Sequence, residues 1–255
     1  MTNILFLDTE TAPSLGYFYG RYDQNISPDQ VVHNGFFLCY QAAINDGEIF
    51  VDSIVDKVTT KRDLLPEDDR ELVIRMAKLV EENDIIVAHN AVKFDLARLY
   101  ARMAAHGLKP IRRPLVVDTL RVCRSIFRFE ANSLDSVCQE LGLGRKFKSG
   151  GFANTISCMR GDKEAWDHLL TYGVHDVKLL RDLYYRVRPW MTNHPNVGAI
   201  SGNHSRVCPV CGSASLRYKG LNKTRQWHTF RCKACGHNCR GSSKADFTAK
   251  PPIRS

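Results

Sequence analysis

The chain has 255 residues, 44% of them apolar, which is enough for one full-size domain with a buried core plus a small module. It contains no run of 18 or more apolar residues and does not start with a basic segment followed by an apolar one, so we expect a soluble cytoplasmic protein and no membrane partner. Charge is unevenly distributed: residues 1–200 carry −1 and residues 201–255 carry +10, enough to attract a polyanion.

Strands and helices are predicted to alternate from the start of the chain. Residues 4–7 form an apolar run without polar alternation, as expected for a central strand covered on both faces. An Asn-Asp-Gly turn between the β-prone runs 36–43 and 48–55 favours a hairpin. Apolar residues at helical spacing predict a helix over 67–83, and residues 84–88 then predict a buried strand.

The same alternation continues towards the C-terminus. Residues 94–106 predict a helix, 115–117 a strand and 133–142 a capped helix. Residues 163–187 are strongly helical and are expected as two helices, or as one helix broken near Gly173.

Three segments of this unit carry acids in positions where a strand or helix would hold them. Asp8 and Glu10 end the first strand, and the strand period of two puts them on one face. Asp95 lies in the first turn of a helix, while Tyr172 and Asp176 are four residues apart and share a helix face. Each segment alone also has a structural interpretation, such as a helix-dipole contact or a solvated surface pair.

Together, the three segments resemble in order and spacing the motifs of the DEDD nuclease superfamily, over residues 3–188. They are similar to the exonuclease domains of family B DNA polymerases and to free-standing phage and bacterial relatives. The most specific part is Ala88-His89-Asn90 followed by Phe94-Asp95. The resemblance implies an α/β, RNase H-like fold with a mixed central sheet flanked by helices, working in a bacterial or phage-infected cell.

The resemblance also implies a site with two Mg²⁺ or Mn²⁺ ions, which are hard cations that prefer oxygen ligands. Asp8 would bridge both ions, Glu10 and Asp176 would hold the ion that activates water, and Asp95 would support the ion at the leaving group. Tyr172, four residues before Asp176, implies the Tyr subtype and would orient the attacking water. Four adjacent acids would repel one another without metal, which argues against a purely structural role.

Neighbouring residues are expected to contact substrate. Asn90 would lie near the terminal nucleotide, and Thr9 would also bind substrate. Phe94 would either stack on a base or fill the core. His175 does not stand where the His subtype places its histidine, so it is interpreted as a packing residue.

Two matching CxxCG turns, separated by 20 residues, indicate a zinc ribbon with one structural Zn²⁺. Its ligands are expected to be Cys208, Cys211, Cys232 and Cys235. Zinc takes four ligands in a closed site, so three nearby residues are left out of the ligand set: His228, His237 and Cys239.

Basic residues alternate with aromatic ones in this ribbon, which suits phosphate contacts and base stacking. The residues expected to contact nucleic acid there are Lys219, Lys223, Arg225, Trp227 and Arg231. A ribbon that serves only as a fold element, or that docks another protein, is the alternative interpretation.

The sequence therefore predicts a nuclease domain over 1–190, a polar linker over 191–206, the ribbon over 207–241 and a basic, disordered tail over 242–255. The expected activity is 3′ to 5′ exonuclease cleavage of single-stranded nucleic acid, with DNA preferred over RNA. An exoribonuclease or structure-selective nuclease on the same fold is one alternative. A nucleic-acid-binding scaffold with a vestigial site is another.

Overall fold

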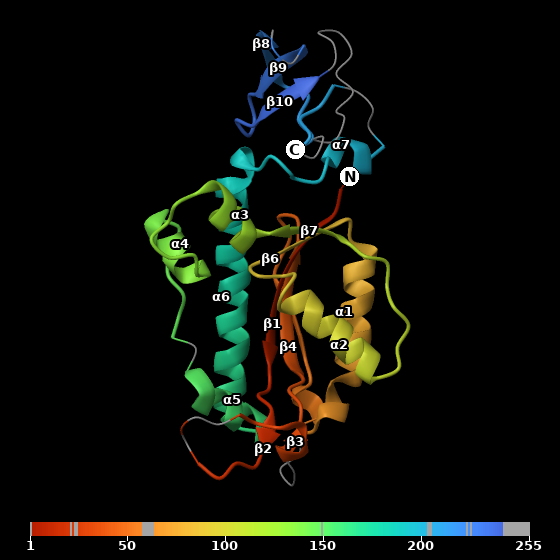
Figure 1. Ribbon diagram of the computed structural model, residues 1–255, viewed down its shortest axis with the longest axis vertical. Coiled ribbons are helices and arrows are strands. Elements are labelled where there is room, and N and C mark those ends of the chain that lie inside the picture. The colour runs from red at the N-terminus through yellow and green to blue at the C-terminus, as the bar shows by residue number, and fades with distance from the viewer. Residues whose placement is uncertain are drawn as a thin grey trace.

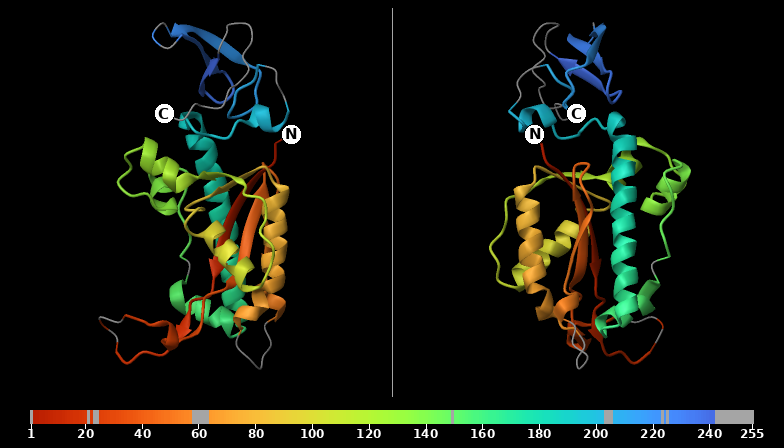
Figure 2. Two further views of the ribbon diagram at one scale, coloured as in Figure 1. Left: turned by 45° about the vertical axis from the view of Figure 1, so that its right-hand side comes forward. Right: turned by 180° about the vertical axis from the view of Figure 1, so that it is seen from behind.

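A computed structural model describes residues 2–20, 22, 25–57, 64–148, 150–202, 206–222, 224 and 226–241. It shows an elongated α/β body with a smaller β unit at one end (Figures 1 and 2). The expected tail, 242–255, lies outside the described residues. The strands are β1 (Ile4–Thr11), β2 (Leu15–Gly16), β3 (Val31–His33), β4 (Phe37–Ile44), β5 (Phe50–Ser53), β6 (Ile85–Ala88), β7 (Leu115–Asp118), β8 (Leu216–Asn222), β9 (Trp227–Cys232) and β10 (Asn238–Gly241). The α-helices are α1 (Arg70–Glu82), α2 (Asp95–Ala105), α3 (Thr119–Ile126), α4 (Leu134–Glu140), α5 (Gly151–Met159), α6 (Lys163–Val187) and α7 (Val197–Ile200).

The central sheet has β1 in its middle. Within the described residues, five strands follow the order β5-β4-β1-β6-β7. β1 is parallel to β6 and antiparallel to β4, so the sheet is mixed. The apolar start of β1 is buried on both faces, as its lack of alternation predicted. The predicted mixed α/β fold with a central sheet flanked by helices is confirmed.

Helices cover the two faces of the sheet (Figure 1). α1 and α2 lie on one face, while α6 runs along the other with α3, α4 and α5 beside it. Alternate residues of β1 join separate core clusters, because successive side chains of a strand point to opposite faces. Leu5 belongs to the cluster with Met76 and Leu99, whereas Phe6 belongs to the cluster with Leu180.

The expectation of two helices, or a break near Gly173, was wrong. α6 is one helix of 25 residues that continues through Gly173. Gly173 is buried against β4, so its missing side chain serves close packing and not a bend. The sequence patterns also did not predict α3, α5 or β10.

Between β1 and β4 the chain leaves the sheet and forms a projection that we call the arm, defined as the described residues between 13 and 34. Its two short strands, β2 and β3, pair in an antiparallel manner. The base of the arm is closed by a hydrogen bond of 2.8 Å from the Ala12 amide to the Phe36 carbonyl.

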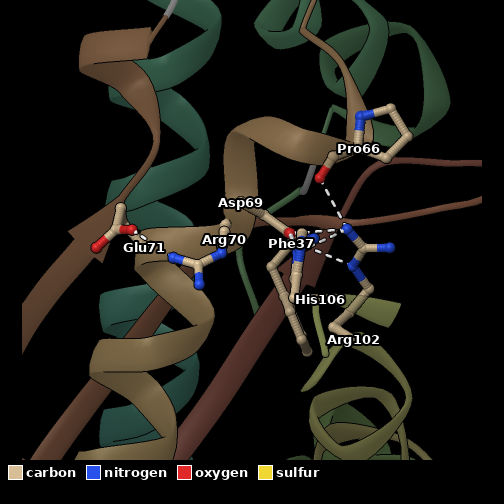
Figure 3. A network of polar contacts seen from close by, with 7 residues as sticks. All are labelled: Phe37, Pro66, Asp69, Arg70, Glu71, Arg102 and His106. Atoms are coloured by element: carbon tan, nitrogen blue, oxygen red, sulfur yellow. Dashed lines mark hydrogen bonds and ion pairs between the residues drawn. The ribbon is translucent and has the colours of Figure 1, made fainter. Parts of the chain in front are cut away.

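A buried network of polar contacts joins α1, α2 and β4 (Figure 3). Asp69, which precedes α1, accepts hydrogen bonds of 2.8 Å from the Phe37 amide and from Arg102 of α2. Arg102 also donates to the Pro66 carbonyl at 2.7 Å, and His106 Nε2 lies 2.5 Å from Asp69 Oδ1. The Asp69 side chain is fully buried, so these partners replace the hydrogen bonds that water would make.

The Arg102→Met variant is expected to lose about 3–5 kcal/mol of unfolding free energy, because it leaves the Asp69 carboxylate buried without its main cation. Urea unfolding followed by circular dichroism measures the loss. The control is Arg75→Met, whose partner Asp52 is partly exposed, and it should cost less than about 1 kcal/mol. Equal losses of unfolding free energy in the two variants would show that the buried network stabilises the protein no more than an exposed ion pair does.

The C-terminal β unit has the strand order β10-β9-β8. It contacts the body through hydrogen bonds from the Val197 amide to the Pro209 carbonyl, at 2.8 Å, and from His237 Nδ1 to the Pro189 carbonyl, at 2.9 Å. Thr2 also donates to the Val197 carbonyl. In the part of the chain that the structure describes, no helix is long and apolar enough to cross a membrane.

Candidate carboxylate centre

β1 presents Asp8 and Glu10 to α6. Phe6, two residues earlier, packs edge-on against Tyr184 of α6, with ring centroids 5.3 Å apart. The period of two carries Asp8 and Glu10 onto this same face. Asp176 of α6 meets them there: one carboxylate oxygen from each of the three acids lies within 4.8 Å of the others.

Gly173 allows this close approach of α6 to the sheet. A Cβ at this position would overlap the side chain of Gln41 on β4. Gln41 pairs with Asp8 across the two strands and is fully buried, so moving its side chain would disturb the packed core. Gly173 therefore determines how closely α6 packs on the sheet, and with it the position of Asp176.

Gly173→Ala is expected to destabilise the protein by about 1–3 kcal/mol, because the added methyl overpacks a buried contact. It should also slow any cleavage, since Asp176 would be displaced. Adding Gln41→Ala provides space for the methyl and should restore both properties in part. Urea unfolding and activity measurements on the two single variants and the double variant test this coupling. Purely additive effects would contradict it.

Asp95 lies next to this group without belonging to it. It is the first residue of α2, it is buried, and it accepts a 2.7 Å hydrogen bond from the Thr9 hydroxyl. Thr9 therefore holds Asp95 in place. The structure brings Asp8, Glu10 and Asp176 together and places Asp95 close enough to raise the pKa of Asp8.

The loop before α2 is fixed by Asp118, which sequence reasoning missed. Its carboxylate accepts hydrogen bonds from the backbone amides of Asn90, at 3.1 Å, and Val92, at 3.3 Å. Asn90 has a positive φ of 81°, a conformation that asparagine tolerates better than most residues. Phe94 is half-buried, with the Arg98 guanidinium 5.5 Å from its ring centre.

Lys146 is a second residue that sequence reasoning missed. Its Nζ lies 2.5 Å from Asp176 Oδ2 and 3.1 Å from the Tyr172 hydroxyl. Its backbone amide donates to Asp135 at 2.7 Å. On α6, His175 Nε2 donates to the Arg145 carbonyl at 2.7 Å. A basic run at 145–148 was visible in the sequence, but no local pattern placed it beside Asp176.

His175 has a packing role in this arrangement. Its ring stacks on Phe147, with centroids 4.0 Å apart and planes 18° from parallel. Together with the bond to Arg145, this stack holds the segment that carries Lys146 against α6.

Burial raises the pKa values of three of the acids, Asp8, Glu10 and Asp95. Burial, followed by the nearby charges of Asp95, Glu10 and Asp176, holds the pKa of Asp8 well above its usual range. Burial and Asp176 raise the pKa of Glu10 to about 7, and burial raises that of Asp95 to about 6. Burial would lower the pKa of Lys146, but Asp176 beside it raises it above its ordinary value. The centre thus has an excess of negative charge that a bound cation would relieve.

A divalent cation fits these residues. Among the described residues, Asp176 Oδ1 is a buried oxygen with no hydrogen-bond partner, although it lies in a group of converging carboxylates. Buried polar atoms are normally satisfied, so an unpaired carboxylate oxygen is what a metal site provides before loading. Oxygen ligands are those that Mg²⁺ and Mn²⁺ prefer.

A cavity of about 540 Å³ opens beside Asp8. Its wall is fixed where His89 Nε2 donates to the Asn132 carbonyl at 2.9 Å, which ties the end of β6 to the start of α4. Burial lowers the pKa of His89, so the ring is neutral near pH 7. The lining includes Asp8, His89, Asn90, Arg124, Ser133 and Lys146.

The four predicted zinc cysteines converge in the C-terminal unit. The Sγ atoms of Cys208 and Cys235 lie 3.7 Å apart, and those of Cys211 and Cys232 lie 3.6 Å apart. A tetrahedron with Zn–S bonds of about 2.3 Å has edges of about 3.8 Å, whereas a disulfide needs about 2.05 Å. The sulfur geometry therefore fits a zinc ion and not disulfides.

The residues left out of the zinc ligand set have other partners. Cys239 Sγ lies 3.9 Å from Cys208 Sγ, outside the group of four. His228 Nδ1 pairs with the Tyr218 hydroxyl at 2.9 Å, and His237 contacts the body through Pro189.

The predicted nucleic-acid contacts of the ribbon are described only in part. Lys219 and Arg231 are exposed, on β8 and β9. Trp227 is half-buried, with the Arg240 guanidinium 4.1 Å from its ring centre. Lys223 and Arg225 lie outside the described residues.

Comparison with known proteins supports the fold. A segment of 72 residues, 28% of this chain, is 31% identical to a DNA polymerase III PolC-type protein of Ureaplasma parvum, of which it covers 5%. The structure of a family B DNA polymerase from the archaeon Pyrobaculum calidifontis matches 74% of this chain and 25% of that polymerase, with a TM-score of 0.54 and 17% identity. No known family profile matches the chain. The chain thus has the fold of part of a family B DNA polymerase and spans a small fraction of either relative.

Proposed function

We propose that the chain is a metal-dependent 3′ to 5′ exonuclease that trims single-stranded nucleic acid, with DNA preferred. The observation that carries the proposal is the convergence of Asp8, Glu10 and Asp176 within 4.8 Å, with one buried oxygen of Asp176 unpaired. Similarity to two DNA polymerases supports a nucleic-acid substrate. The 3′ to 5′ direction and the preference for DNA rest on the resemblance of the motifs alone.

The acids would hold two Mg²⁺ or Mn²⁺ ions, which supply an activated water and stabilise charge on the attacking and leaving oxygens. Glu10 and Asp176 would hold the ion at the water, Asp95 the ion at the leaving group, and Asp8 both. Thr9 keeps Asp95 oriented through its hydroxyl. The terminal nucleoside would occupy the cavity beside Asp8, where Asn90 lines the wall.

Tyr172 would position the attacking water by hydrogen bonding. Burial raises its pKa to about 12, so it stays protonated and acts as a donor, not as a base. Lys146 touches both Tyr172 and Asp176. Its positive charge would steady the acids before metal enters and would then face the substrate phosphate.

The proposed division of the chain is a nuclease domain over 1–190 and a zinc ribbon over 207–241, joined by the linker 191–206. The zinc ion would be structural, because four cysteines close its coordination. Lys219, Trp227 and Arg231 would help to hold the strand.

The direct test is incubation of the protein with 5′-labelled single-stranded DNA or RNA in Mg²⁺ or Mn²⁺. A ladder of shortened labelled products is expected, and Asp8→Ala should abolish it. Strands with internal duplex or fork structure distinguish a structure-selective nuclease. No product from any substrate with either metal would leave only the binding-scaffold alternative.

Cleavage at low metal concentration is expected to rise with pH between about 5.5 and 8, because Glu10 and Asp95 must lose their protons to bind a cation and their pKa values are about 7 and about 6. Raising the Mg²⁺ concentration should move this rise to lower pH.

The stability of the metal-free protein should show the opposite dependence on pH. The raised pKa of Glu10 means that the folded state holds more protons, so stability falls as pH rises from about 4.5 to 7. Rates measured over a pH and Mg²⁺ grid, and melting without Mg²⁺, test both trends; a pH-independent rate would contradict the first.

A further inference from the structure

The arm carries a cluster of exposed aromatic side chains that the proposed site does not use. Tyr17 is 79% exposed, Phe18 56%, Tyr19 fully and Tyr22 84%. A single exposed apolar side chain is common on a protein surface, but several together usually mark a binding site. Among the described residues, none of the buried core clusters includes Tyr17, Phe18 or Tyr19.

The backbone is held in place where this aromatic run begins, at Tyr17. The Tyr17 amide donates to the Gln30 carbonyl at 2.8 Å, and Gln30 Nε2 donates back to the Tyr17 carbonyl at 3.1 Å. A Cβ at Gly16 would lie 2.6 Å from the Gln30 carbonyl oxygen. Only glycine therefore allows the backbone at residue 16 to approach the backbone at residue 30 this closely. Tyr17 therefore projects from a pre-organised backbone, which reduces the entropy cost of binding.

The arm is continuous with the carboxylate centre. It begins directly after β1, and its base closes at Ala12, two residues beyond Glu10. All views place it beside α5, which follows the segment of Lys146 (Figures 1 and 2). On α5, Phe152 is 71% exposed, which adds a further ring at this end of the molecule. A strand leaving the centre towards this end would meet the arm.

We propose that the arm binds unpaired bases of the strand whose 3′ end occupies the carboxylate centre, by stacking on Tyr17, Phe18 and Tyr19. The proposal rests on the proposed function for the position of that 3′ end. Stacking on aromatic rings tolerates any base, because every base has a π-face. Tyrosine suits such a wet surface, since its hydroxyl remains solvated while its ring makes the contact. The contact is to bases and not to phosphates, so its contribution should not depend on salt.

Binding of a 5′-labelled oligothymidylate of about 20 nucleotides is measured by fluorescence anisotropy in an Asp8→Ala background, where the strand is not degraded. The triple variant Tyr17→Ala/Phe18→Ala/Tyr19→Ala should bind about 5- to 100-fold more weakly, as expected for the loss of one stacked base or more. The slope of affinity against salt should stay unchanged. Replacing bases by abasic sites should weaken binding to the intact arm and have little further effect on the triple variant.

Two matched variants separate ring stacking from other effects. Tyr17→Phe/Tyr19→Phe keeps the rings and should retain binding. Val32→Ala removes an exposed aliphatic side chain from β3 of the same arm and should also retain it. Circular dichroism and melting confirm that each variant is folded.

Three results would overturn the proposal. The first is a triple variant that binds as tightly as its parent. The second is a loss of affinity accompanied by a smaller dependence of affinity on salt, which would indicate lost phosphate contacts. The third is sedimentation that shows the aromatic residues holding two copies of the chain together. Failure of the proposed function has a different signature, because the protein with Asp8 intact would then cleave no strand whatever the arm binds.

Discussion

Replacing Asp8 with asparagine is expected to lower the cleavage rate at least about a thousandfold while making the metal-free protein more stable. The rate falls because Asp8 is the acid proposed to hold both ions. These ions stabilise the charge that develops in the transition state, by several kcal/mol. The gain in stability follows because Asp8 is buried among Glu10, Asp95 and Asp176, and its ionised form is unfavourable without a cation. The amide keeps the shape and removes the charge.

Rates with labelled single-stranded DNA and melting temperatures with and without Mg²⁺ measure the two effects. Asp167→Asn on the exposed face of α6 is the control, and it should alter neither property. Mg²⁺ should raise the melting temperature of the parent and leave that of Asp8→Asn nearly unchanged. An Asp8→Asn variant with a tenth or more of the parent's rate would remove Asp8 from the catalytic centre.

The positions of the acids on their elements could be predicted because they depend on local periodicity. The period of two put Asp8 and Glu10 on one face of β1, and the helical spacing put Tyr172 and Asp176 on one face of α6. Lys146 could not be found in this way. It is 30 residues from Asp176 along the chain and lies in an irregular segment held by tertiary contacts.

Helix α6 shows how a local signal can mislead. Gly173 has a low helix propensity, which favoured a break, but the packing of α6 on β4 requires a residue without a side chain there. The arm was missed for a related reason. β2 and β3 have two and three residues, too few for an alternating pattern to emerge.

The double variant Cys208→Ser/Cys211→Ser is expected to lose its zinc and to unfold the ribbon while leaving the α/β body folded. The core of the ribbon is small, with Val210 and Phe230 as its large buried apolar residues beside the cysteines. A module of this size depends on its metal, because structural zinc contributes about 10–16 kcal/mol of binding energy to the folded state. In the part of the chain that the structure describes, hydrogen bonds at Val197 and Pro189 join the ribbon to the body.

Metal content by mass spectrometry and backbone NMR spectra of the two regions measure this loss. The control is Cys239→Ser, which removes a buried thiol 3.9 Å from Cys208 but outside the group of four, and it should keep one zinc per chain. Cleavage of short strands should survive in the double variant, because the carboxylate centre lies in the body. Its affinity for long strands should depend less steeply on salt, since Lys219 and Arg231 would no longer be held in place. An unchanged salt slope would mean that the ribbon docks a protein or only completes the fold, and loss of zinc from Cys239→Ser would assign a fifth cysteine to the metal.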